Sequence, residues 1–161
     1  MRSPHPDGRR FVIAAEPNAI SGALACLAEI GEVHPLEGTT SWVLQVKQKD
    51  EPQTVWRRIL ACLPSAEWVA PVLVDEREEP HYPTGDISVR FDHSPSPKEL
   101  ERFASTRRLR LLGRNEFAPQ QASFRPDRPQ DTYLPDLVQT LAGEKGVIAA
   151  WANTRSQYRR A

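Results

Sequence analysis

One arrangement of residues occurs twice in this chain and limits what the chain can fold into: an amphipathic helix, a tight turn and a short buried strand. In residues 134–141, four apolar side chains follow the i, i+3, i+4, i+7 spacing of a helix with one buried face. Gly143 and Gly146 can take the positive φ that ends a helix, and residues 147–151 form an apolar run of strand length. Residues 56–63 have the same helical spacing and also precede a strand pattern.

The similarity extends to the segments that precede these helices. Residues 11–15 and 87–91 both alternate side chains as strands do, and each is followed by a turn and a helix pattern. Those helices match at a constant offset of 76, Leu24 with Leu100, whereas the second helix and strand match at an offset of either 78 or 81. The sequence therefore predicts two diverged copies of roughly 75 residues each.

Each copy has the order strand, helix, strand, strand, helix, strand. In the first copy we expect strands at 11–15, 32–36, 42–47 and 67–74 and helices at 19–30 and 52–63. In the second we expect strands at 86–91, 109–113, 121–125 and 147–151 and helices at 97–107 and 132–141. This order predicts an α+β fold of two ferredoxin-like (β-α-β-β-α-β) antiparallel sandwiches in tandem. The expected boundaries are a loose arm at 1–9, a first unit at 10–76, a linker at 77–84 and a second unit at 85–161 that ends in an extended tail.

Such a fold offers a surface for a partner. Two helices cover one face of each sheet, and the other face must be solvated or covered by another molecule. Charge is uneven, because residues 1–80 carry 8 basic and 12 acidic side chains and residues 81–161 carry 13 and 9. Such a charge difference is typical of solvated surfaces, and it also attracts the two halves of the chain to each other. The alternative interpretation is that the basic second half binds an acidic partner.

A few features bear on the cellular compartment and on cofactors. The N-terminal sequence MRSPHPDGRR lacks the apolar segment of a secretory signal, and no stretch approaches the ~18 apolar residues of a membrane span. A full-length chain would therefore be cytoplasmic, whereas the inference fails for a chain cut from a precursor. Cys26 and Cys62 fall in predicted helices, where we interpret them as small buried hydrophobic residues, with a disulfide or a reactive thiol as the alternative. The histidines and cysteines lack metal-site spacing, so no metal or other cofactor is expected.

No catalytic motif is recognisable, so we expect a binding protein rather than an enzyme. The chain lacks a nucleophile elbow, a P-loop and a dinucleotide fingerprint, and its carboxylate pairs, such as Asp75-Glu76, lie in predicted turns. RNA binding is an alternative, because the RNA-recognition module has the same element order. The arginines that would support it are Arg102, Arg107, Arg108, Arg110 and Arg114. Phe91 and Phe124 are better explained as core residues than as base-stacking ones, so we expect no nucleic-acid partner.

Three stretches of the second copy resemble, in the same order, parts of one known domain. PTGDISVRF at 83–91 resembles the opening strand of the propeptide (inhibitor) domain of subtilisin-like serine proteases, and SPKELERF at 96–103 resembles its first helix. LVQTLAGEKGVIAAWANTRSQYRR at 137–160 resembles its closing helix, turn, strand and polar tail. In the first copy, VWRRILACLPSAEWVAP at 55–71 resembles the same closing part, and 72–91 resembles the junction in proteases with a doubled N-terminal segment. The protease's own Asp, His and Ser motifs are absent, so the chain resembles a separated propeptide or a stand-alone relative.

The resemblance implies a binding mechanism. In that family the bare sheet face packs on two surface helices of the protease, and the C-terminal tail lies in the active-site cleft as an extended, substrate-like strand. The implied partner is a subtilisin-like serine protease, inhibited or assisted in folding, in cis before processing or in trans, with no membrane involved. The implied tail consists of Asn153, Thr154, Arg155, Ser156, Gln157, Tyr158, Arg159, Arg160 and Ala161, with Tyr158 and its flanking arginines as the main contacts.

Two alternatives remain open at this point. The tail residues also fit a frayed, soluble C-terminus. Tandem ferredoxin-like units occur as well in regulatory modules of the ACT type, which bind a small metabolite at an edge between domains. That likeness is of fold only, because the chain lacks a glycine-rich turn after its first strand. A non-catalytic regulatory or protein-interaction module is therefore the alternative to a protease inhibitor.

Overall fold

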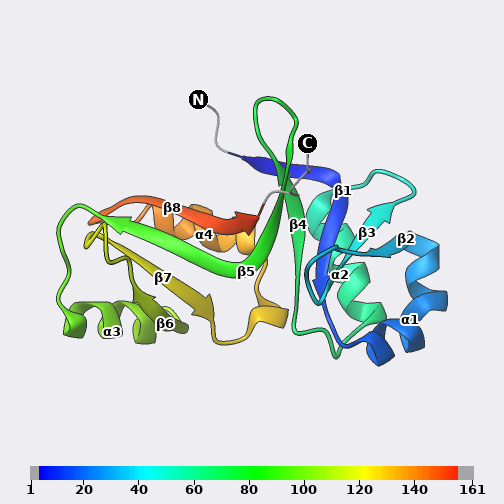
Figure 1. The fold of residues 1–161 in the computed structure, drawn as a ribbon, viewed down its shortest axis with the longest axis horizontal. Helices are drawn as coiled ribbons and strands as arrows, with labels where there is room; N and C mark the ends of the chain where they lie inside the picture. Colours follow the sequence, from blue (N-terminus) through cyan, green and yellow to red (C-terminus); the bar gives the residue numbers. More distant parts are fainter. Residues whose placement is uncertain (1–3, 156–161) are drawn as a thin grey trace. The chain divides into compact units, whose positions relative to one another are not determined.

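The computed structural model describes residues 4–155, which form an α+β protein with antiparallel strands and four α-helices (Figure 1). The predicted α+β class is confirmed. The chain divides into two compact units, of which one takes in Met1–Pro83 with the residues from Thr154 onward and the other is Thr84–Asn153. Within residues 4–155, no helix has both the length and the apolar character needed to cross a membrane.

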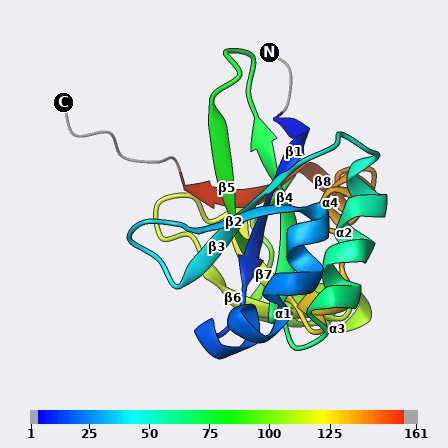
Figure 2. The same ribbon diagram turned by 90° about the vertical axis from the view of Figure 1, so that its right-hand side faces the viewer.

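The first unit has six elements in the order β-α-β-β-α-β. They are β1 (His5–Ala14), α1 (Pro17–Ile30), β2 (Gly31–Pro35), β3 (Ser41–Val46), α2 (Pro52–Cys62) and β4 (Trp68–Val74). The strands lie in the order β2-β3-β1-β4, and each is antiparallel to its neighbour. Figure 2 shows α1 and α2 side by side over one face of these strands.

Local sequence explains where the helices of this unit begin and end. Both α1 and α2 begin at a proline, Pro17 and Pro52, whose fixed φ suits the first helical position and whose missing N–H would have no intrahelical partner there. The chain passes directly from α1 into β2 at Gly31. A Cβ on Gly31 would lie 1.9 Å from the carbonyl oxygen of Gln45 on β3, so only glycine allows this close approach.

Apolar side chains are buried on both faces of the first sheet. On the helix face, Phe11 and Ile13 of β1 are fully buried, as is Ile59 of α2. The other face carries a second apolar cluster. Its members are Val12, Leu36, Val72 and Tyr82, with Val43 and Trp68 packed against them. The first unit therefore has no solvated polar face at the centre of its sheet, which agrees with the second of the two expectations, a covered face.

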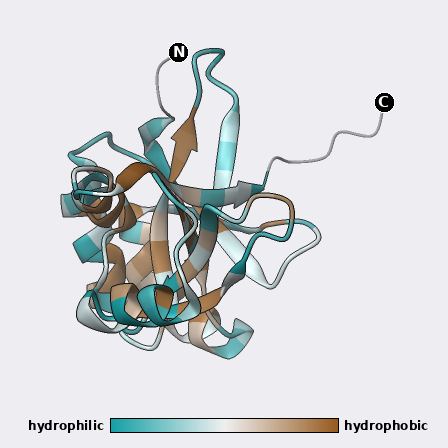
Figure 3. Cartoon of the chain, turned by 90° about the vertical axis from the view of Figure 1, so that its left-hand side faces the viewer, coloured by the Kyte–Doolittle hydropathy of each residue, from teal (hydrophilic) through white to brown (hydrophobic). Residues whose placement is uncertain are grey.

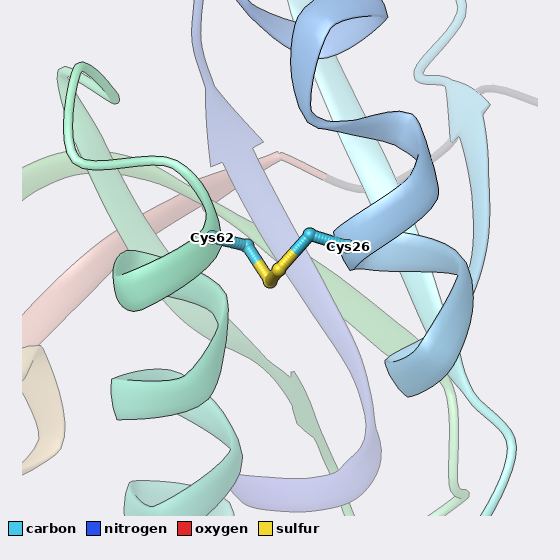
Figure 4. The surroundings of a disulfide bond; sticks show 2 residues. All are labelled: Cys26 and Cys62. Atoms are coloured by element: carbon cyan, nitrogen blue, oxygen red, sulfur yellow. A yellow bond between two sulfur atoms is a disulfide. The ribbon is translucent and has the colours of Figure 1, made fainter.

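A disulfide joins α1 to α2, between Cys26 and Cys62, and its Cα atoms are 5.6 Å apart (Figure 4). The interpretation of the two cysteines as small buried hydrophobic residues is therefore wrong. Cys26 is exposed and Cys62 half-buried, because both lie at positions away from the buried stripes of their helices. Pairing depends on how the two helices pack, which spacing along the sequence does not define.

The second unit repeats the same order of elements. They are β5 (Pro80–Phe91), α3 (Pro97–Thr106), β6 (Leu109–Arg114), β7 (Gln121–Pro126), the 3₁₀ helix η1 (Pro129–Asp131), α4 (Leu134–Ala142) and β8 (Val147–Arg155). The strands lie in the order β8-β5-β7-β6. β7 is antiparallel to β5 and to β6, and the arrows of β5 and β8 point in opposite directions in Figure 1.

Phenylalanines form the centre of the second unit's core. Phe103 of α3 lies between Phe91 of β5 and Phe124 of β7, with ring centroids 5.0 and 5.3 Å apart. Phe124 is fully buried, and so is its cross-strand partner Ile87. The prediction that Phe91 and Phe124 are core residues is confirmed. Figure 3 shows the apolar colouring concentrated in the strands, with polar residues on outer turns of the helices.

Two segments differ from the sequence expectations. Residues 5–9, expected as a loose arm, belong to β1, which pairs with β4 at His5 and Pro6 and has a register shift before Phe11. The expected linker is strand from Pro80 onward. Prolines and charged residues dominate both segments, and they mask the alternation that identifies a strand.

Helix α3 begins with a complete capping box and a charged bridge. The Ser96 hydroxyl accepts a hydrogen bond from the Glu99 N–H, and the Glu99 carboxylate accepts one from the Ser96 N–H. The imidazole of His93 lies 2.7 Å from Asp92 and 2.8 Å from the second oxygen of Glu99. Hydrogen bonds to Asp92 and Glu99 raise the pKa of His93, and the bond to His93 lowers the pKa of Glu99.

These shifts predict a pH window for the stabilising effect of His93. Because the pKa of His93 is raised in the folded state, His93 stabilises the fold. This stabilisation is complete below pH 6.5 and is lost as the pH rises through the folded-state pKa. Because the pKa of Glu99 is lowered in the folded state, Glu99 also stabilises the fold. This stabilisation is present above pH 4.5 and is lost as the pH falls through the folded-state pKa. His93→Gln should therefore lower the melting temperature most between pH 4.5 and pH 6.5, and least in alkaline solution. A difference from wild type that grows with rising pH would contradict the bridge.

Candidate functional site

The second unit presents a sheet face that its own helices do not cover. Ile87, Val89 and Phe91 of β5 are buried toward α3 and α4, so the alternate residues of that strand point the other way. Their cross-strand partners and side-chain contacts identify the rest of this surface. We call it the open face: Asp86, Ser88, Arg90, Arg110, Gln121, Ser123, Arg125, Trp151 and Asn153.

A hydrogen-bond network orders one end of the open face. The Ser88 hydroxyl donates to the side-chain oxygen of Asn153 at 2.6 Å and lies 3.2 Å from the Ser123 hydroxyl. Arg125 Nε donates to Asp86 at 2.7 Å, joining β7 to β5. Ser88 is 3% exposed, so its hydroxyl is satisfied by protein partners rather than by water. This end is consequently preorganised.

The other end of the open face is amphipathic. The Arg90 guanidinium lies 5.8 Å from the ring centroid of Trp151, and Arg90 Nη2 donates to the Gln121 side chain at 3.5 Å. A cation over an indole ring is a favourable contact that also flattens both side chains against the sheet. Arg90 is exposed and Trp151 half-buried, so both can contact a partner without rearrangement of the backbone.

The open face contains residue types that are frequent at the centres of protein interfaces. It contains three arginines and a tryptophan, no lysine and no glutamate, and its one carboxylate, Asp86, already pairs with Arg125. Interface centres are enriched in Arg and Trp and depleted in Lys and Glu, and such residues carry most of the binding energy. Arg90 and Arg110 give the face an excess of positive charge. A surface of this charge attracts acidic side chains.

Two of the five arginines that would favour nucleic acid have partners within the protein. Arg107 Nε donates to Glu144 at 2.6 Å, and its guanidinium covers the ring of Phe103. Arg114 donates to the carbonyl oxygen of Pro95. Only Arg110 belongs to the open face, so the cluster in the sequence does not act as one basic patch.

Outside the open face, the described residues contain a charged turn and a cavity that could be considered as sites. Asp75 accepts hydrogen bonds from the N–H groups of Arg77 and Glu79 in the β4–β5 turn, and its bond to His81 at 2.8 Å lowers the Asp75 pKa. A cavity of about 770 Å³ in the first unit is lined by charges of both signs. Among residues 4–155, no group of three His, Cys, Asp or Glu side chains is arranged to hold a metal.

The structure places the predicted tail partly inside the fold. Asn153, Thr154 and Arg155 are the last residues of β8, and the Asn153 carbonyl accepts a hydrogen bond from Thr84 at 3.4 Å. The first three residues of the expected tail therefore coincide with the end of β8. Its remaining members, residues 156–161, lie outside the described residues.

Sequence reasoning did not find the residues of the open face. A signal for them existed, because Ser88 and Arg90 alternate with the apolar residues of β5, and Gln121, Ser123 and Arg125 do so in β7. The apolar pattern of residues 147–151 predicts a buried Trp151, whereas its side chain is half-buried in the structure. No known protein family matches this sequence, and no match is found among curated proteins.

Proposed function

We propose that the chain is a propeptide-like inhibitor or folding assistant of a subtilisin-type serine protease, and that its two units are ferredoxin-like sandwiches in tandem. The second unit docks on the protease through the open face, and the residues that follow Arg155 occupy the active-site cleft. The observation that carries the proposal is an open face rich in arginine and tryptophan, of which the strand leading into the tail, β8, forms one part.

Docking and tail insertion reinforce one another in this proposal. A tail tethered to a docked unit reaches the cleft at a high effective concentration, so a weak peptide becomes a strong inhibitor. An extended segment gains affinity from main-chain hydrogen bonds to an edge of the cleft, with alternate side chains in pockets. The ordering of Asn153 by Ser88 fixes where the tail leaves the sheet, which limits the entropy lost on binding.

The same contacts support a role in protease folding. A molecule that binds the folded protease and not the unfolded chain stabilises the folded state by mass action. A preorganised face is suited to this role, because it presents the complementary surface before the protease has completed its own. The positive charge of Arg90 and Arg110 favours encounter with an acidic protease surface.

The Cys26–Cys62 disulfide supports an oxidising compartment as the site of action. Disulfides persist in secreted and periplasmic proteins and are rare in the reducing cytosol. We therefore propose this location in place of the cytoplasmic one expected from the N-terminal sequence.

Charge reversal on the open face tests the docking step. Arg90→Glu should weaken binding to a subtilisin-type protease with a covalently blocked cleft by about tenfold or more, because it places like charges opposite each other. Arg128→Glu is the control, since Arg128 follows β7, is not one of the open-face residues, has a side chain that is 79% exposed and pairs only loosely with Asp131, at 3.9 Å. Calorimetry provides the dissociation constants. Equal weakening by both variants would indicate a general charge effect and contradict docking by this face.

A further inference from the structure

A fully exposed aromatic side chain lies at the tip of the hairpin between β6 and β7. Phe117 is 95% exposed, whereas the other exposed large hydrophobic residues in the described chain range from 42% to 59%. A side chain of this size contributes nothing to a core from such a position. Burying it against another molecule would remove most of its apolar surface from water, which is the main source of binding free energy.

The loop that carries Phe117 is ordered by one side chain. The Asn115 side-chain oxygen accepts hydrogen bonds from the N–H groups of Phe117 at 2.9 Å and Ala118 at 3.2 Å. Backbone bonds close the same loop, from Asn115 N–H to the Gln121 carbonyl and from Gln121 N–H to the Ala118 carbonyl, both 2.9 Å. The backbone that carries Phe117 is thus ordered before binding, which limits the entropy lost on binding.

Phe117 lies at a defined end of the second unit's sheet. The hairpin leads into β7 at Gln121, which pairs with Arg90, and Arg90 contacts Trp151. Because the strands are antiparallel, the exposed Leu112 near the end of β6 lies at this same end. Asn153, from which the tail continues, lies at the opposite end of β8. One end of the open face thus carries an aromatic group, and Asn153, near the end of β8, lies at the other.

We propose that Phe117 is an anchor residue of the docking surface and fills an apolar pocket of the protease outside its active-site cleft. This assignment rests on the proposed function and adds a second fixed point to it. Insertion of the Phe117 side chain at one end and of the tail at the other defines both the position and the direction of the docked unit.

Alanine substitution tests the anchor in the full-length chain. Phe117→Ala should raise the inhibition constant for a subtilisin-type protease by about tenfold or more, as expected for a buried aromatic anchor. Its melting temperature should be unchanged, because the side chain is exposed. Leu24→Ala on α1 is the control, since Leu24 is also an exposed apolar residue, at 49%, and should leave inhibition unchanged. With p-benzoylphenylalanine in place of Phe117, illumination should cross-link the chain to the protease.

The outcomes separate this inference from the proposed function. Inhibition by Phe117→Ala within twofold of wild type, with Arg90→Glu still impaired, would overturn the anchor and leave the protease role standing. Binding of a labelled oligonucleotide that is lost in Phe117→Ala would also overturn it, because the aromatic group would then serve base stacking. A wild-type chain that inhibits no member of a panel of subtilisin-type proteases would overturn both.

Discussion

Removing the disulfide between α1 and α2 is expected to lower the stability of the first unit by ~2–4 kcal/mol. The bond closes a long loop, since its cysteines are separated by 36 positions, and it limits the conformations open to the unfolded chain. The double variant Cys26→Ser, Cys62→Ser should show this loss directly. Serine is suitable because Cys26 is exposed and Cys62 half-buried, so neither hydroxyl is forced into a core.

Urea unfolding with and without a reductant measures the effect. The reduced wild-type protein should unfold at the same urea concentration as the double variant, and the reductant should not alter the variant. The second unit serves as an internal control, because it contains no cysteine and its unfolding should be independent of the reductant. Two titratable thiols in freshly purified, unreduced protein would contradict the disulfide.

The periodic parts of the chain were predictable from sequence because one face of each element is buried. Residues 121–125 were expected as a strand, and β7 spans Gln121–Pro126, with Ala122 and Phe124 buried. The helix predicted at 132–141 is α4, Leu134–Ala142, and its buried residues include Leu134 and Leu141. Burial on one side imposes the apolar spacing that sequence reasoning detects.

The parts that escaped prediction depend on contacts between distant residues. The β1 segment at 5–9 is strand because it pairs with the end of β4, and its own composition gives little sign of it. The end of β8 is strand although Asn153 is polar, because β8 pairs with β5, and the Asn153 side chain there meets the Ser88 hydroxyl 65 positions away. Neither partner can be identified before the strand order is known.

The candidate site shows the same limit. A bare sheet face was expected from the element order, but its residues were not identified, since Arg90, Gln121 and Trp151 meet only in the folded sheet. The exposed Phe117 was equally invisible, because an isolated phenylalanine in a sequence predicts burial. The first unit has no such polar face, because Val12 and Val72 make the corresponding face of its sheet apolar.

Deleting residues 156–161 should have the largest functional effect. With the tail absent nothing enters the cleft, so inhibition of a subtilisin-type protease should be abolished, while docking through the open face persists. Because the shortened chain keeps every helix and strand of the described residues, we expect its melting temperature to equal that of the full chain. Deletion of residues 1–3 at the other terminus is the control and should leave inhibition intact.

The most direct measurement compares the full chain with the chain ending at Arg155 in two assays with one subtilisin-type protease. The first assay is peptide hydrolysis by the active enzyme, and the second is calorimetric binding to the enzyme with a covalently blocked cleft. We predict that the shortened chain no longer slows hydrolysis and still binds the blocked enzyme, with affinity that Arg90→Glu reduces. Equal inhibition by both chains, or no binding of either chain to the blocked enzyme, would contradict this account.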